Sequence, residues 1–439
     1  MREPASGPIL AGVLVLLLGL SAGPSPRGGA AAAGALPSRR ALQNGPAFIF
    51  QRDTSSAVTV LGIVIGGGKA AEPEGQQGLA HLTTRLSLEI TDEGKAQDLM
   101  SQSTRLSTTV EEDYALILIE SLSSHFEEAL KTASEIILDP LFSGFRIDFI
   151  KESMAHQARL EQDDPSRAGR PAALRAFFGP SGYGASVFGN EQSLKAIHKD
   201  NIRGFYRDRF RTGNLSFIVV SDLEEVQIEG WLRKYFNKLP AGNPPPAAAL
   251  LAPALREKEN TIDKANKQTF VSFVFPLPAL SLRTYALGSL LETGLGKGVG
   301  SKLWPLRSKA RLAYNVGARA TTGRSGGVLE ALLETDASKT TAAIEALETT
   351  LKDFAASGFS EDELRTTKAY AKADFLRDYE GKGSRVRILA FCEGTGLGLD
   401  AYNRFAELVD EVGLEEMNAF CRSVLEPSQA ARVVIGPLR

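Results

Sequence analysis

The strongest constraint on the fold is that the second half of the chain repeats the first. Three pairs of short segments match in the same order and at nearly the same separation along the chain. Any single match could be chance, whereas three in order indicate two copies of one domain. The pairs are Ile117–Ser121 with Ala331–Thr335, Phe142–Phe145 with Ala356–Phe359, and the helix–turn–strand stretches that begin at Phe205 and Phe420.

Each copy mixes short apolar runs, typical of strands, with stretches of helical periodicity. The order is not a regular alternation of strand and helix, so the pattern predicts an α+β fold of two homologous domains. We expect each domain to be a mostly antiparallel sheet covered by helices. The predicted strands are Ala47–Phe50, Val58–Ile65, Tyr114–Glu120 and Phe217–Val220 in the first copy, and Phe270–Phe275, Leu312–Val316, Val328–Leu333 and Arg432–Ile435 in the second.

The chain ends and the region between the copies differ in composition from the rest. Ile9–Leu20 is an apolar run with the length of a signal-peptide core, and small residues follow it. We therefore predict a signal peptide at 1–22, which indicates export, with an uncleaved membrane anchor as the alternative. Gly, Ala and Pro dominate the next stretch and the one between the copies. The predicted order continues as a disordered linker 23–43, a first domain 44–240, a linker 241–256 and a second domain 257–439.

The composition excludes several classes of site. The net charge of −2 offers no basic excess for a nucleic-acid partner. Only four histidines and two cysteines are present among 439 residues, and no Cys/His cluster has metal-binding spacing. Cys392 and Cys421 lie in the same copy, and the sequence leaves open whether they form a disulfide or remain free thiols.

One motif bears on chemistry. After the strand predicted at Val58–Ile65 comes GGGKAAEPEGQQGLAHLTTRLS, which contains Gly78-Leu79-Ala80-His81. Here the sequence resembles the pitrilysin/insulinase family of zinc peptidases, in which a helix bears the inverted motif HxxEH. In that family the two histidines share one helix face and bind Zn²⁺, the glutamate is the general base, and a glutamate on a later helix completes the site. The resemblance implies that each copy is half of a clamshell.

This chain keeps only the first residue of that set. His81 fits, but Thr84 stands at the general-base position and Arg85 at the second ligand position. His156 or Gln157 falls where the family places its last glutamate. A guanidinium cannot bind a metal ion, so we predict no metal in this chain and no zinc hydrolysis by it alone. A relict site from His81 and His156 is the alternative to two ordinary polar positions, and a lone peptidase with an unusual metal site is a third.

The second copy retains a different part of the family pattern. LRSKARLAY resembles the family's R/Y pair and places Arg307 and Tyr314 seven residues apart. In the family the tyrosine donates to the oxyanion and the arginine holds substrate carbonyls. Many bacterial members read RGLAY here, so Arg311 is a second candidate. Without a functional role, Tyr314 would pack on a strand face with Leu312 and Val316, and Arg307 would be a solvated helix residue.

Together these features predict a subunit that is incomplete alone. The resemblance implies a heterodimer in which this chain supplies Arg307 and Tyr314 to the zinc site of a homologous HxxEH-bearing partner, acting on peptide substrates in the periplasm. Zinc is expected in the partner, and no cofactor in this chain. The rival hypothesis is a structural or peptide-binding scaffold of the same fold with no peptidase role.

Overall fold

The computed structural model describes residues 35–43, 45–244 and 252–437. The predicted signal peptide, most of the first linker and the middle of the linker 241–256 lie outside these residues. Among the helices of the described ranges, none has the length and apolar character needed to cross a membrane.

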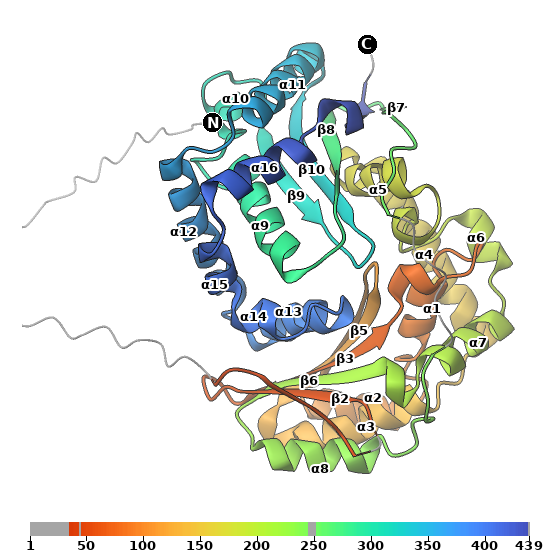
Figure 1. The fold of residues 1–439 in the computed structure, drawn as a ribbon. Coiled ribbons are helices and arrows are strands. Elements are labelled where there is room, and N and C mark those ends of the chain that lie inside the picture. Colours follow the sequence, from red (N-terminus) through yellow and green to blue (C-terminus); the bar gives the residue numbers. More distant parts are fainter. Residues whose placement is uncertain (1–34, 44, 245–251, 438–439) are drawn as a thin grey trace, which may run out of the picture. The chain divides into compact units, whose positions relative to one another are not determined.

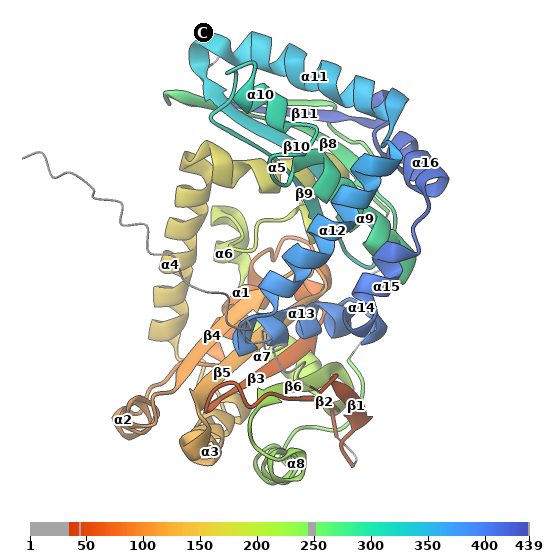
Figure 2. The same cartoon turned by 90° about the vertical axis from the view of Figure 1, so that its left-hand side faces the viewer.

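The first sheet has six strands in the order β1-β2-β6-β3-β5-β4 (Figures 1 and 2). All of its neighbouring strands are antiparallel except β2 and β6, which run parallel. Apolar side chains on one face pack against α3 and α8. The strands are β1 (Ser38–Ala41), β2 (Ala47–Arg52), β3 (Val58–Gly66), β4 (Arg105–Val110), β5 (Tyr114–Leu122) and β6 (Leu215–Ser221).

The second sheet has five strands in the order β7-β11-β8-β10-β9. Its single parallel pair, β7 with β11, occupies the place that β2 and β6 hold in the first sheet. One face packs against α9, α11 and α16. The strands are β7 (Glu259–Asp263), β8 (Gln268–Leu277), β9 (Asn315–Thr321), β10 (Gly327–Asp336) and β11 (Ala431–Gly436).

Leaving β1 aside, the two sheets have the same topology, with β2, β6, β3, β5 and β4 equivalent to β7, β11, β8, β10 and β9. The matched segments Ile117–Ser121 and Ala331–Thr335 lie in the equivalent strands β5 and β10. The predicted duplication and the α+β fold class are thus confirmed.

Helices follow the same repeat. The first copy contains α1 (Leu79–Leu86), α2 (Glu93–Ser101), α3 (Phe126–Leu138), α4 (Gly144–Asp163), α5 (Pro165–Phe178), α6 (Glu191–Ala196), α7 (Lys199–Arg209) and α8 (Glu225–Tyr235). The second contains α9 (Leu282–Gly296), α10 (Trp304–Ser308), α11 (Thr340–Ser357), α12 (Glu361–Asp378), α13 (Lys382–Gly394), α14 (Asp400–Asn403), α15 (Phe405–Asp410) and α16 (Leu414–Val424).

The two copies exchange one helix each. The other face of the first sheet packs against α13 of the second copy, and the other face of the second sheet packs against α5 of the first (Figures 1 and 2). A glycine permits each close approach. A Cβ on Gly62 would lie 2.5 Å from Val386 of α13, and one on Gly169 of α5 would lie 2.4 Å from the Phe270 ring. The exchange buries the second apolar face of each sheet.

Both cysteines are buried and free, which decides between the two alternatives left by the sequence. Cys392 of α13 packs against the first sheet, whereas Cys421 of α16 lies in the core of the second copy. Burial raises the pKa of each thiol to about 12, so both remain protonated at neutral pH.

Two local predictions are wrong. Ser38–Ala41, expected in a disordered linker, forms β1, because its backbone pairs with β2 and Arg39 binds Glu393 of α13 at 2.9 Å. The strand expected at Leu312–Val316 begins only at Asn315, since pairing of β9 with β10 starts there and Arg311 has a left-handed φ of 54°.

Candidate functional site

Helix α1, which bears the remaining histidine of the motif, is capped by a buried carboxyl group. Its N-cap is Gly78, whose φ of 95° favours glycine. Glu72 Oε1 accepts hydrogen bonds from the backbone nitrogens of Gly78 at 3.1 Å and Ala80 at 2.9 Å. Burial raises the pKa of Glu72 to about 8 although these bonds lower it, so the carboxyl group is mostly protonated at neutral pH.

The side chains at the motif positions make local contacts instead of a metal site. The His81 ring meets Phe188 edge-on, with ring centroids 5.3 Å apart. Burial and then the charge of Arg85 lower the pKa of His81 to about 4, so the imidazole is neutral. Thr84 is buried and donates its hydroxyl proton to the Ala80 carbonyl at 2.8 Å. Arg85 is exposed and pairs with Glu89 at 3.3 Å.

Helix α4 carries the two residues expected at the third position of the family's site, and one of them, Gln157, lines a cavity with His81. Gln157 lines a small cavity of about 80 Å³ together with His81 and Arg85. His156 is exposed and does not line that cavity, so the structure does not bring His81 and His156 together in it. The remaining lining residues are Phe149, Ile150, Ser153, Met154 and Phe188.

This set of donors does not fit zinc. A single imidazole, an amide and a guanidinium replace the two imidazoles and the carboxylate that the family uses. Within the described ranges, no group of three or more His, Cys, Asp or Glu side chains could hold a metal ion. The residues at this position therefore cannot perform zinc-dependent hydrolysis.

A larger cavity of about 560 Å³ adjoins the emptied site. Gln157 and Phe188 line both cavities, and the larger one extends to Arg319 on β9 of the second copy. Its wall includes Thr109 and Val110 at the end of β4, one of the two edge strands of the first sheet. The outer backbone groups of an edge strand can pair with an extended peptide.

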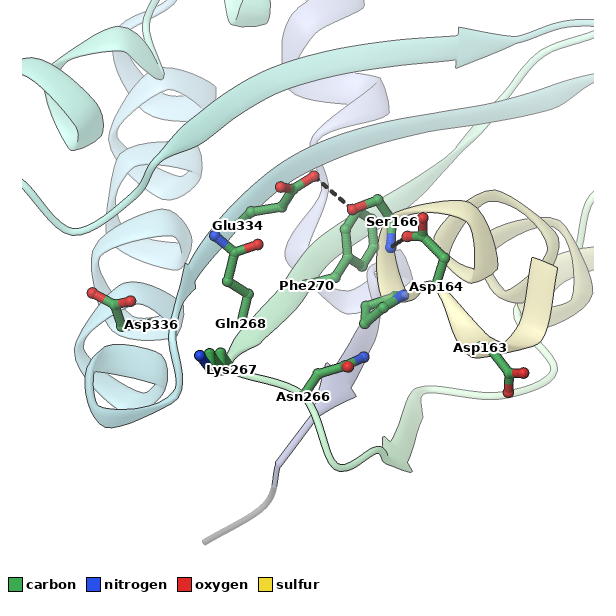
Figure 3. Close-up of a pocket in the computed structure, with 10 residues that line it drawn as sticks. Asp163, Asp164, Ser166, Asn266, Lys267, Gln268, Phe270, Glu334 and Asp336 are labelled. Atoms are coloured by element: carbon green, nitrogen blue, oxygen red, sulfur yellow. Dashed lines mark hydrogen bonds between the residues drawn. The ribbon is translucent and has the colours of Figure 1, made fainter. Parts of the chain in front are cut away.

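A third cavity, of about 700 Å³, lies between the start of α5 and the ends of β8 and β10 (Figure 3). Ser166 of α5 donates its hydroxyl proton to Glu334 of β10 at 2.7 Å, and Asp164 accepts from the Ser166 backbone nitrogen at 2.9 Å. The backbone nitrogen of Tyr314 donates to the Glu334 carbonyl at 2.9 Å, which places Tyr314 beside the same strand. The other labelled side chains are Asp163, Asn266, Lys267, Gln268, Phe270 and Asp336.

The R/Y residues lie on the surface. Tyr314 is 74 % exposed, which contradicts the alternative in which it packs on a strand face. Arg307 of α10 is exposed, with its guanidinium carbon 5.1 Å from the centroid of the Trp304 ring. Arg311 is also exposed. None of these three lines the cavities described above, so the structure does not bring them together with His81.

Comparison with known proteins agrees with this architecture. Residues 47–178 match the profile of the insulinase family (peptidase family M16), and residues 196–370 match that of the peptidase M16 inactive domain. The chain belongs to the M16 peptidase family. Because the ligand set is reduced to His81, it is an inactive, non-peptidase homologue within that family.

Relatives of this chain match most of its length at low identity. It is 23 % identical over 370 residues to a non-peptidase homologue, YmxG, of Helicobacter pylori, covering 82 % of this chain and 84 % of that one. It is 21 % identical to an uncharacterised zinc protease, YmxG, of Bacillus subtilis, covering 90 % and 97 %. The crystal structure of a peptidase M16 inactive domain from Pseudomonas fluorescens has the same fold, with a TM-score of 0.83, 21 % identity and coverage of 92 % and 98 %.

The sequence did not point to several residues that line the cavity of about 560 Å³. Arg170, Arg319 and the buried carboxyl group of Glu112 are scattered along the chain and belong to no recognisable spacing. Only Glu111-Glu112-Asp113 offered a signal, as an acidic run immediately before the strand predicted at Tyr114–Glu120.

Proposed function

We propose that this chain is the R/Y-bearing, non-catalytic subunit of a heterodimeric zinc peptidase. The observation that supports this most directly is the 74 % exposure of Tyr314, with Arg307 exposed nearby in the sequence. The chain's own motif helix cannot hold the zinc ion that these residues would serve. They are therefore available to a second chain.

In this proposal the partner is a homologue with an intact HxxEH motif, and the metal-bound water belongs to that partner. The Tyr314 hydroxyl donates a hydrogen bond to the oxyanion as a peptide carbonyl is attacked, and the Arg307 guanidinium binds substrate carbonyl oxygens. The apolar run Ile9–Leu20 supports export, so we place the pair and its peptide substrates in the periplasm.

The test is a peptidase assay with the purified chain, with a candidate HxxEH-bearing homologue, and with the two mixed. We expect activity only in the mixture. Tyr314→Phe in this chain should lower kcat by about 100- to 1000-fold, as loss of one oxyanion donor does. Tyr370→Phe, at another partly exposed tyrosine, is the matched control and should leave kcat unchanged. Full activity of the partner alone, or of the Tyr314→Phe mixture, would overturn the proposal.

A peptide-binding scaffold is the second candidate. The cavity of about 560 Å³ beside the outer edge of β4 supports it, because such an edge can hold a peptide without any metal. In that case peptides bind to this chain alone, and neither a zinc-bearing partner nor Tyr314 changes the result.

A further inference from the structure

Two arginines from different copies face one cavity. Arg170 lies on α5 of the first copy and Arg319 on β9 of the second. Both line the cavity of about 560 Å³ and the adjoining one of about 200 Å³. Because α5 packs against the second sheet, the exchange of helices described above brings these two guanidinium groups to the same cavity.

Arg170 is only partly satisfied by the protein. Its Nη2 donates to Glu112 Oε1 at 3.2 Å, while its Nε is buried and has no hydrogen-bond partner within the described ranges. Glu112 is shared, because Lys69 Nζ lies 3.1 Å from the same carboxylate oxygen. Burial tends to raise the pKa of Glu112, but Lys69 and Arg170 outweigh it and the pKa is lowered. One buried carboxylate thus faces two cations.

Arg319 is also left with donors to spare. Its Nε donates to Glu330 Oε2 at 2.8 Å, and its buried Nη2, which lies 2.8 Å from the same oxygen, makes no hydrogen bond within the described ranges. Burial raises the pKa of Glu330, and burial together with Glu112 raises that of Glu111. The side chains that line the cavity of about 560 Å³ include four basic ones, Lys69, Arg167, Arg170 and Arg319, and three carboxyl groups, Glu111, Glu112 and Glu161. The cavity wall has more positive than negative charge.

A guanidinium binds carboxylate in a two-pronged geometry, and such bonds are strongest where water is partly excluded. The same cavity offers the edge of β4 at Thr109 and Val110 and the apolar side chains of Leu174, Val187 and Phe188. An extended chain with an anionic group fits this combination better than a free anion does. We propose that Arg170 and Arg319 form a subsite that binds a carboxylate of a peptide lying along β4.

This subsite goes beyond the proposed subunit role, because it is complete in one chain and needs no zinc-bearing partner. The carboxylate could be an Asp or Glu side chain or the C-terminus of the peptide, since the chemistry of recognition is the same. Failure of the R/Y proposal would leave the subsite untouched, and loss of the subsite would leave the Tyr314 test unaffected.

The test is fluorescence anisotropy of labelled peptides with the full chain. Three peptides of equal length are used, one with an internal Glu and an amidated end, one neutral with a free C-terminus, and one neutral and amidated. We expect one of the first two to bind about 10- to 100-fold more tightly than the third. Which of them does so identifies the source of the carboxylate.

Arg170→Gln should remove this preference and leave the binding of the neutral amidated peptide unchanged. Arg319→Gln alone would leave the buried Glu330 carboxyl group without its partner, so the second variant combines Arg319→Gln with Glu330→Gln. Thermal unfolding checks that Arg170→Gln and this double variant are folded. Arg404→Gln, at an exposed arginine paired with Glu407, is the matched control. Equal binding of all three peptides, or a preference that survives in folded Arg170→Gln and in the double variant, would overturn the proposal.

Discussion

The helix of the degenerate zinc motif and the Arg307–Tyr314 stretch differ in opposite ways from the active site of the family. Helix α1 has lost its chemistry but remains part of the core through Leu79, Leu82 and Leu86. Arg307 and Tyr314 keep the residue types of the family's R/Y pair, and both side chains are exposed. Because apolar packing holds α1 in place, the residues at its zinc-ligand positions could change without loss of the fold.

The largest effect on this difference is expected from restoring the zinc ligands at the degenerate motif. Arg85→His with Gln157→Glu places two imidazoles at i and i+4 and a carboxylate on the same small cavity. We expect the double variant to bind one Zn²⁺ per chain with a Kd of about 1 μM or lower, about 8 kcal/mol of binding free energy. Calorimetry and metal analysis measure this.

The control for that variant uses the neighbouring position on α4. Arg85→His with His156→Glu places the new carboxylate at a position that does not line the small cavity, and we expect no tight zinc binding from it. Equal zinc affinity of the two double variants would show that Gln157 does not occupy the family's third position.

The difference in packing predicts a difference in stability. Leu82 is fully buried in α1, so Leu82→Ala should lower the free energy of unfolding by about 2–5 kcal/mol. Tyr314→Ala removes a side chain that is 74 % exposed, and its effect should stay within about 0.5 kcal/mol. Denaturant unfolding measures both. A large cost at Tyr314 would mean that this side chain is structural.

Glu72 makes the cap of α1 sensitive to pH. Its pKa is raised from 4.5 to about 8 in the folded chain, so the unfolded chain loses the proton first as the pH rises. The stabilising contribution is complete below about pH 4.5 and is lost by about pH 8. Between pH 5.5 and 8 we expect the free energy of unfolding to fall by about 1–3 kcal/mol more in the wild type than in Glu72→Gln. Parallel pH profiles of the two proteins would contradict this.

The smallest effect concerns the backbone just before Tyr314. Arg311 has a φ of 54°, a conformation that costs an L-residue about 1 kcal/mol and glycine almost nothing. Arg311→Gly should therefore raise the free energy of unfolding by up to about 1 kcal/mol. If the variant also keeps full activity in the mixture with a partner, Arg311 is excluded as the functional arginine and Arg307 remains.

The strands that could be predicted were those buried on both faces. β3, β5, β8 and β10 are long apolar runs, and their periodicity is visible without any partner. β1, β4 and β7 were missed because they are edge strands with mostly partly or fully exposed side chains, so their sequences do not differ from those of loops. β4, one of the missed strands, borders the cavity for which we propose peptide binding.

By itself, the sequence determined the duplication, the fold class and the loss of the zinc ligands. Each of these follows from the identity and spacing of residues along the chain. Only the tertiary structure decided that Gln157, not His156, lines a cavity with His81, that Tyr314 is exposed, and that α5 and α13 cross to the opposite sheets. These features depend on which faces of separate elements meet. Arg170 and Arg319 line one cavity only because the tertiary structure brings α5 and β9 together.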